Sequence, residues 1–154
     1  MVAIFQETRG KMSFDLTLSN GDLVIKNGDF DVVEDSDKLI QDVLKFLSTP
    51  LGSNPFFPQY GSPISKVMIG LGYDQDFNET VLTQQLITSL TNLQTLQMSQ
   101  QKSNQIVTPK EQIATIKDVQ IFKADDDPRG IYVNLSVISK AFQSVPVSFA
   151  VVQS

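Results

Sequence analysis

The sequence contains no cysteine, no histidine and no tryptophan. Without cysteine there is no disulfide framework and no thiolate metal site. Without histidine the chain lacks the commonest general base and the commonest metal ligand, and neither a Ser-His-Asp nor a Cys-His arrangement is possible. We therefore expect a protein that is not an enzyme, with no catalytic residues, no cofactor, no metal and no small-molecule substrate.

A strongly basic segment is also missing. The formal net charge is -5, and residues 15–42 alone contribute -6, because they hold eight acidic residues against Lys26 and Lys38. A nucleic-acid binder needs a basic surface for phosphate, so no nucleic-acid partner is expected. The acidic residues are interpreted as solvated strand faces and turns rather than as a metal site.

Long apolar runs are absent as well. No stretch approaches the roughly 20 apolar residues of a membrane span, so no membrane association is expected. The first residues carry their charges after a short apolar run, the reverse of a secretory signal, which favours synthesis and folding in a cytoplasm. With 154 residues and 41% hydrophobic residues, the chain can build one core, so we predict one domain over 1–154, with 1–12 as an N-terminal extension.

Alternating apolar residues predict short strands within residues 14–33. The first is expected over residues 14–18 and ends at Asn20-Gly21. The strongest local signal is Asn27-Gly28, which predicts a tight hairpin because both turn positions need positive φ.

Two amphipathic helices are predicted. The first covers residues 37–47, with Asp35 or Ser36 as its N-cap. The second runs from about residue 78 to 98, and no charged side chain occurs over residues 80–101. A free surface helix normally carries Lys and Glu, so this face indicates either contact with another protein or a compositional habit of the source.

The remaining segments complete a mixed fold. A helical turn is predicted over 63–68 and a flexible segment over 69–75. Three strands follow, over 113–122, 131–139 and 145–152. The fold class is therefore α+β, a single domain with an antiparallel β-sheet and two main helices packed on one face.

The most informative segment lies between the first helix and the helical turn. Its glycines permit unusual backbone, its prolines stiffen it, and it carries large apolar groups where a surface loop would normally be polar. These aromatic residues either cap the core or anchor a partner, and we expect both uses, with at least one ring inward. The predicted interaction residues of this loop are Thr49, Gly52, Phe56, Phe57, Pro58, Tyr60 and Gly61.

This segment resembles the baseplate wedge and sheath-initiator family of contractile phage tails, a lysozyme-like wedge family related to a type VI secretion baseplate component. The family pattern is approximately T-x-x-G-E-x-x-x-x-P-x-[YF]-G, and Thr49, Gly52, Pro58, Tyr60 and Gly61 stand at the matching positions. The preceding acidic strands and helix also look like the family's entry into that loop. The resemblance covers residues 15–69 and is looser toward the C-terminus.

The resemblance implies a structural protein of the virion, located in the tail baseplate and assembled in the host cytoplasm. Its implied partners are the tail sheath protein, other wedge proteins and hub or tube proteins, with six copies in the baseplate. Ser53 stands where the family usually has Glu. The family's Glu-Pro-Arg subunit clamp also has no full match, and Lys110 and Glu111 are its nearest counterparts.

A sheet edge that accepts sheath strands by β-augmentation is a further implication of the resemblance. The last predicted strand is compatible with it, because Pro146 favours an edge position and residues 141–154 carry no charge. The predicted interaction residues there are Val145, Val147, Phe149 and Val151. A covered or terminal strand with no guest is the alternative.

Two other functions compete with this interpretation. One is a lysozyme-like tail enzyme that degrades cell walls, although no Glu lies within an apolar run on a cleft-forming element. The other is a soluble regulatory binding protein, because a bacterial anti-adaptor resembles the same fold. A wall-turbidity assay and the neighbouring genes would separate these hypotheses.

Overall fold

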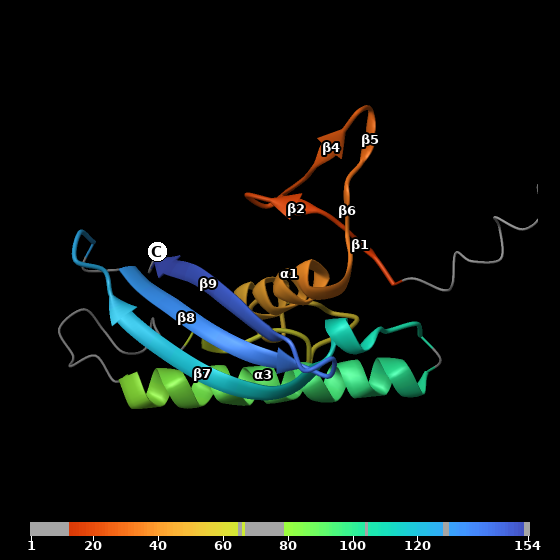
Figure 1. Cartoon of the computed structure of the whole chain (residues 1–154). Coiled ribbons are helices and arrows are strands. Elements are labelled where there is room, and N and C mark those ends of the chain that lie inside the picture. Colours follow the sequence, from red (N-terminus) through yellow and green to blue (C-terminus); the bar gives the residue numbers. More distant parts are fainter. Residues whose placement is uncertain (1–12, 65, 67–78, 104, 128–129, 153–154) are drawn as a thin grey trace, which may run out of the picture.

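The C-terminal part of the chain forms a three-stranded antiparallel sheet in the computed structural model (Figure 1). Its strands are β7 (Ile113–Lys123), β8 (Gly130–Ser139) and β9 (Ser144–Val152), in the order β7-β8-β9. All three predicted strands are confirmed within two residues at each end. The structure describes residues 13–64, 66, 79–103, 105–127 and 130–152.

Two helices cover one face of this sheet, α1 (Asp35–Ser48) and α3 (Glu79–Lys102). Helix α3 packs against β7, and α1 packs against β9 and α3 (Figure 1). Side chains of β8 alternate between a buried face that meets the helices and an exposed outer face, as the period of a strand requires. The α+β fold class, with both main helices on one face of an antiparallel sheet, is confirmed.

The core lies between the helices and the sheet. Apolar side chains recur at helical spacing on α1 and α3 and at every second position on the strands, so both elements present one continuous apolar surface. The side chains at its centre are almost fully enclosed: Leu39, Val43, Phe46, Leu86, Leu90, Ile113, Val137, Val145 and Val147.

The start of α1 differs from the prediction. Neither Asp35 nor Ser36 caps the helix; the N-cap is Glu34, which makes no side-chain cap hydrogen bond. The two predicted caps are engaged elsewhere, because the Asp35 carboxylate lies 3.1 Å from Lys110 Nζ and Ser36 Oγ lies 3.3 Å from Gln143 Oε1. Both contacts reach parts of the chain far away in sequence, which local propensity does not reveal.

Helix α3 extends four residues beyond its predicted end at Met98, to Lys102. The added turn is polar, so the apolar period that predicted the helix had already stopped. Of the predicted helical turn at 63–68, Ile64 and Lys66 are helical, Pro63 forms a bend instead, and residues 65, 67 and 68 lie outside the described residues. The predicted flexible segment 69–75 lies wholly outside them.

Residues 15–33 form a three-lobed element, here called the trefoil, which stands off from the helices and sheet (Figure 1). At its centre three residues that lie between strands are joined in a ring by backbone hydrogen bonds: Thr17 N to Asp31 O (2.9 Å), Val24 N to Thr17 O (3.0 Å) and Asp31 N to Val24 O (2.9 Å). The lobes are antiparallel ribbons made by β1 (Asp15–Leu16) with β6 (Val32–Val33), β2 (Leu18–Ser19) with β3 (Asp22–Leu23), and β4 (Ile25–Lys26) with β5 (Asp29–Phe30).

The trefoil follows a seven-residue repeat. Each repeat opens with an aspartate whose Oδ1 accepts the N–H of the next residue, at 2.9 Å for Asp15, 2.8 Å for Asp22 and 2.8 Å for Asp29. The three residues of the central ring are therefore also seven apart. The predicted continuous strand over 14–18 is wrong, because the chain changes ribbon at Thr17.

Two Asn-Gly turns close the outer lobes. The predicted hairpin at Asn27-Gly28 is confirmed, with φ of 53° and 82°. Asn20-Gly21 has nearly the same geometry, with φ of 52° and 83°, and closes a hairpin of its own. Positive φ at both positions is the requirement of a type I′ turn, which explains why the same dipeptide occurs twice.

One glutamine of α1 attaches the trefoil to the helix. Gln41, only 9% exposed, accepts the Leu18 N–H at 2.8 Å and donates to Leu16 O at 2.8 Å and to Asp15 Oδ2 at 3.0 Å. The Asp15 carboxylate also pairs with Lys45 Nζ. The side chains of Gln41 and Lys45 on α1 thus bind the Asp15 carboxylate, and Gln41 also binds backbone groups of β1 and β2. These contacts fix the trefoil to the helix.

The Asp15–Lys45 pair makes trefoil attachment dependent on pH. Burial raises the pKa of Asp15, but hydrogen bonds from Lys45 and Gln41 and the Lys45 charge outweigh it, so the pKa lies below the ordinary 3.8. A lowered folded pKa stabilises the fold above the ordinary value, and this stability is lost as pH falls through the folded pKa. Because the pair is partly exposed, we expect Asp15→Asn to destabilise by about 1 kcal/mol at pH 7.

The measurement is urea unfolding at pH 7 and at pH 3, with Asp29→Asn, on an exposed ribbon, as the charge-matched control. The destabilisation by Asp15→Asn should shrink at pH 3, because the wild-type carboxyl then loses part of its advantage. An equal effect of the two substitutions at pH 7 would show that the ion pair does not attach the trefoil.

Candidate protein-interaction site

The predicted loop, residues 49–61, is here called the aromatic loop, and backbone hydrogen bonds close its base. Thr49 is the C-cap of α1, and its N–H and its Oγ1 donate to Lys45 O at 3.1 and 2.6 Å. Ser62 N then donates to Thr49 O at 2.8 Å, and Leu51 N donates to Ser62 O at 3.1 Å. The two ends of the loop therefore lie side by side, and the segment between them projects as a unit.

Both predicted glycines have positive φ, but their surroundings differ. Gly52 has φ of 82°, forms the third position of a turn closed by Ser53 N and Pro50 O at 3.1 Å, and has open space around it. Gly61 has φ of 114°, and a Cβ placed there would lie 2.5 Å from Thr49 O. Only hydrogen fits at Gly61, because the two ends of the loop pass so close together.

The three aromatic residues of the loop divide between core and surface. Tyr60 turns inward and meets Phe46 edge to face, with ring centroids 5.1 Å apart and an interplanar angle of 78°. Burial raises the pKa of the Tyr60 hydroxyl above its ordinary value. Phe56 and Phe57 remain 86% and 67% exposed. The expectation of at least one inward ring is confirmed by Tyr60, whereas the use of the outward rings as partner anchors stays a prediction.

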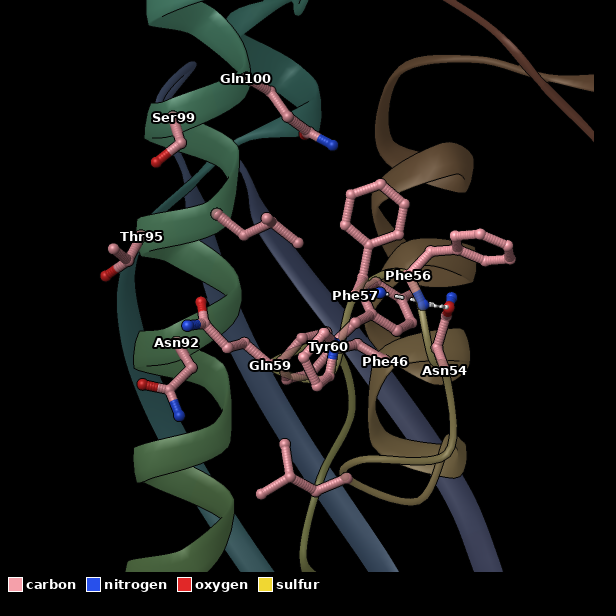
Figure 2. A pocket seen from close by; sticks show the side chains of 13 residues that line it. Phe46, Asn54, Phe56, Phe57, Gln59, Tyr60, Asn92, Thr95, Ser99 and Gln100 are labelled. Carbon is pink, nitrogen blue, oxygen red and sulfur yellow. Dashed lines mark hydrogen bonds between the residues drawn. The ribbon is translucent and has the colours of Figure 1, made fainter.

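The exposed rings stand on an ordered backbone. Asn54 Oδ1 accepts the N–H groups of Phe56 at 3.0 Å and Phe57 at 3.3 Å (Figure 2). Tyr60 N donates to Phe57 O at 2.9 Å, which closes a turn with Pro58 at its second position, where the fixed φ of proline suits it. The loop thus holds two large apolar groups in water without relying on a partner for its conformation.

A groove of about 970 Å³ runs between the aromatic loop and α3 (Figure 2). Phe56 and Phe57 form its outer wall, and α3 contributes a row of neutral side chains that includes Asn92, Leu96 and Gln100. None of the lining residues carries a charge. The uncharged face of α3 and the predicted interaction loop therefore form one surface.

Strand β9 is an edge strand, since within the described residues it pairs with β8 alone. Ser139 N donates to Gln143 O at 2.9 Å, and hydrogen-bonded and non-hydrogen-bonded pairs alternate from there. The β8–β9 ladder has no bulge, so this alternation makes the pairs that contain Ser148 and Ala150 non-hydrogen-bonded. The backbone amides of these two residues therefore point away from β8. Pro146 lies in the same phase, where its missing N–H costs no ladder bond.

The side chains predicted to meet a partner on β9 point the other way. Val145 and Val147 are each 2% exposed, and Phe149 and Val151 pack against the core. The alternation of the strand turns these four side chains inward, so the predicted partner contact of this strand stays a prediction for its backbone. What β9 offers to a partner is its outer backbone edge.

The two predicted clamp residues also have different settings. Lys110 is exposed, and its Nζ lies 3.1 Å from the Asp35 carboxylate. Glu111 is 1% exposed, with Oε2 3.8 Å from Lys38 Nζ and Oε1 without a hydrogen-bond partner among the described residues. Glu111 is therefore an internal residue of this fold, and the clamp assignment of Lys110 and Glu111 stays a prediction.

A buried glutamine that the sequence analysis missed explains this geometry. Gln97 of α3 donates to Glu111 O and accepts the Ile113 N–H, both at 2.9 Å. It fixes the 3-10 turn η2 (Pro109–Glu111) to α3 immediately before β7. A glutamine within an uncharged polar helix gives no signal of burial, so the sequence alone could not identify it.

Other kinds of site find no support among the described residues. No group of three or more acidic side chains there could hold a metal ion. None of the described helices has an apolar stretch long enough to cross a membrane.

Comparison with known proteins gives a likeness of fold. No protein-family model matches the chain, and a search of curated proteins finds no significant match. A crystal structure of a Geobacter sulfurreducens protein, provisionally named a tail lysozyme, is similar to this chain with a TM-score of 0.50 and 11% identity. The similarity covers 86% of this chain and 97% of that protein. At this identity, the likeness concerns the fold alone.

Proposed function

We propose that this protein is a non-enzymatic structural component of a contractile phage tail baseplate, an inner wedge protein that initiates the sheath. The observation that carries the proposal is β9, an edge strand in an uncharged segment whose outer amides face away from β8. The fold it shares with a protein provisionally named a tail lysozyme supports a tail context. The family pattern in the aromatic loop supports the baseplate assignment.

The edge of β9 has the properties of a strand acceptor. A bare edge invites aggregation, and soluble proteins usually protect it with lysine, proline, a bulge or a short strand. Of these devices β9 has only Pro146, near its start. Here β9 spans nine residues, and its ladder with β8 has no register shift. A strand from a sheath subunit would add main-chain hydrogen bonds along this edge. The remaining proposed partners, wedge and hub or tube proteins, would meet other faces in six copies.

A structural role also fits the placement of the carboxylates. The groove contains no acidic residue, whereas glycoside hydrolysis needs two carboxylates at the scissile bond. Asp15, Asp35 and Asp42 are instead held in ion pairs with lysines. Purified protein that lowered the turbidity of cell walls, and lost this activity when one carboxylate was replaced, would refute the non-enzymatic role.

The test of the edge is Ser148→Pro. This substitution removes one outward amide and leaves the β8–β9 bonds in place, because Ser148 shares the phase of Pro146. We expect baseplates that assemble but carry tubes without sheath, seen by electron microscopy of particles made with the variant. Edge strands tolerate proline, so the fold should persist.

Ser136→Thr on the neighbouring strand is the control, because it changes the outer face of the sheet but not the edge. Normal sheath on particles with Ser148→Pro would reject β-augmentation at β9. Loss of the whole baseplate, with the variant still folded by circular dichroism, would instead assign β9 to contact with another wedge protein.

A further inference from the structure

The groove beside the aromatic loop has no function in the proposal for the β9 edge, because none of its lining residues belongs to β9. Its wall holds Phe56 and Phe57 outward on a loop whose conformation is fixed by Asn54. Its floor is α3, which has no charged residue from 80 to 101. Two exposed phenylalanine rings over a neutral, hollowed surface are the composition of an interface centre rather than of a free surface.

Charge and hydrogen bonding restrict what can fill this groove. A charged segment would lose its hydration without meeting a counter-charge, which is unfavourable. An extended segment would bring unpaired backbone groups, while the nearby loop amides of Phe56, Phe57 and Tyr60 already have acceptors. An α-helix pairs its backbone N–H and C=O groups within itself, so it can fill the groove using side-chain contacts alone.

We propose that this groove binds an amphipathic α-helix of another baseplate protein, through a helix face that carries apolar anchors and no charge. The origin of the helix in a baseplate protein rests on the proposed function. The apolar, uncharged character of its binding face follows from the residues that line the groove. The bound helix lies along α3 and beneath Phe56 and Phe57, at the 8–10 Å separation of packed helices.

The dimensions set the spacing of the anchors. The lining residues of α3 run from Asn92 to Gln100, a length of about 12 Å at 1.5 Å per residue, or roughly two turns. A partner helix therefore places anchors at i, i+3 or i+4, and i+7. The side-chain amides of Asn92 and Gln100 make no hydrogen bond to other described residues, so they remain available to neutral polar groups at the helix margin.

The experiment selects ligands from a displayed library of random peptides, each long enough for about four helical turns. We expect the enriched peptides to share apolar residues at i, i+3 or i+4, and i+7 on an uncharged face, and to become helical when bound. Phe57→Ser should weaken a selected peptide at least about tenfold. Phe142→Ser, at a 90% exposed phenylalanine in the β8–β9 turn, is the matched control and should change nothing.

Each other outcome overturns the proposal. Enriched peptides with charged anchors, with extended structure, or with binding unaffected by Phe57→Ser would do so, as would a selection that enriches nothing. Binding of chitin oligosaccharide that depends on Phe57 would assign the groove to a glycan. Self-association by sedimentation that Phe57→Ser abolishes would assign it to a second copy. Ser148→Pro should leave peptide binding intact, so the two proposals fail independently.

Discussion

Gly61→Ala is expected to destabilise the fold by about 3 kcal/mol or more. This loss should exceed that of an added methyl group at Gly52, the other glycine of the loop. The Cβ added at Gly61 would lie 2.5 Å from Thr49 O and 3.1 Å from the carbonyl atoms of Pro50. All these atoms are backbone, and Thr49 O also accepts the Ser62 N–H that closes the loop. The strain can be relieved only by opening that closure.

Gly52→Ala is the matched control. It places the same methyl group at φ of 82° in open space, so only the left-handed backbone penalty of about 1–2 kcal/mol applies. The measurement is urea unfolding of both variants. Equal losses would show that backbone strain alone accounts for Gly61 and that the close approach of the loop ends is unimportant.

Truncation after Lys140 is expected to abolish cooperative folding. It removes β9, whose Val145 and Val147 are each 2% exposed, and burial of each is worth about 1.5–3 kcal/mol. It also removes nine backbone pairs with β8 and bares one side of that central strand. A total stability of about 5–15 kcal/mol would not survive these losses.

The checks are circular dichroism and amide dispersion in two-dimensional NMR spectra. Ser148→Pro is the comparison, because it alters the same strand without removing core side chains. A truncated protein that unfolded cooperatively would show that the core closes without β9. Bare tubes from a truncated protein would therefore carry no information on sheath recruitment, which is why the edge is tested by a single proline.

Elements with strong periodicity could be predicted from the sequence. The Leu stripe of α3 and the alternation in β8 and β9 each express one buried face, and Asn27-Gly28 specifies its turn through positive φ. The expectation of at least one inward ring in the aromatic loop is also confirmed, although the sequence did not indicate that this ring is Tyr60. For the helix, the strands and the turn, the pattern of residues within the element specifies its structure, whereas the inward position of Tyr60 depends on Phe46 of α1.

Features that depend on distant partners could not be predicted. Gln41 and Gln97 are buried because backbone groups of other elements need them, and nothing in their own helices indicates this. Glu111 likewise looks like a surface residue until η2 is packed on α1 and α3. The seven-residue repeat of the trefoil was not predicted either, because it reflects a ring of backbone hydrogen bonds that does not depend on side chains.

That ring has a consequence for how the trefoil tolerates change. The hydrogen bonds at Thr17, Val24 and Asp31 involve only main-chain atoms at the centre of the trefoil. The residues at the tips of the lobes take no part in joining them. The polar contacts to Gln41 and Lys45 come from the β1–β6 lobe and from Leu18 of the β2–β3 lobe, and among the described residues none comes from the β4–β5 lobe. The turn at Asn27-Gly28 is therefore a suitable site for inserting an epitope or a fluorophore. Lengthening the β4–β5 lobe there leaves the central ring of hydrogen bonds and the contacts to α1 unchanged.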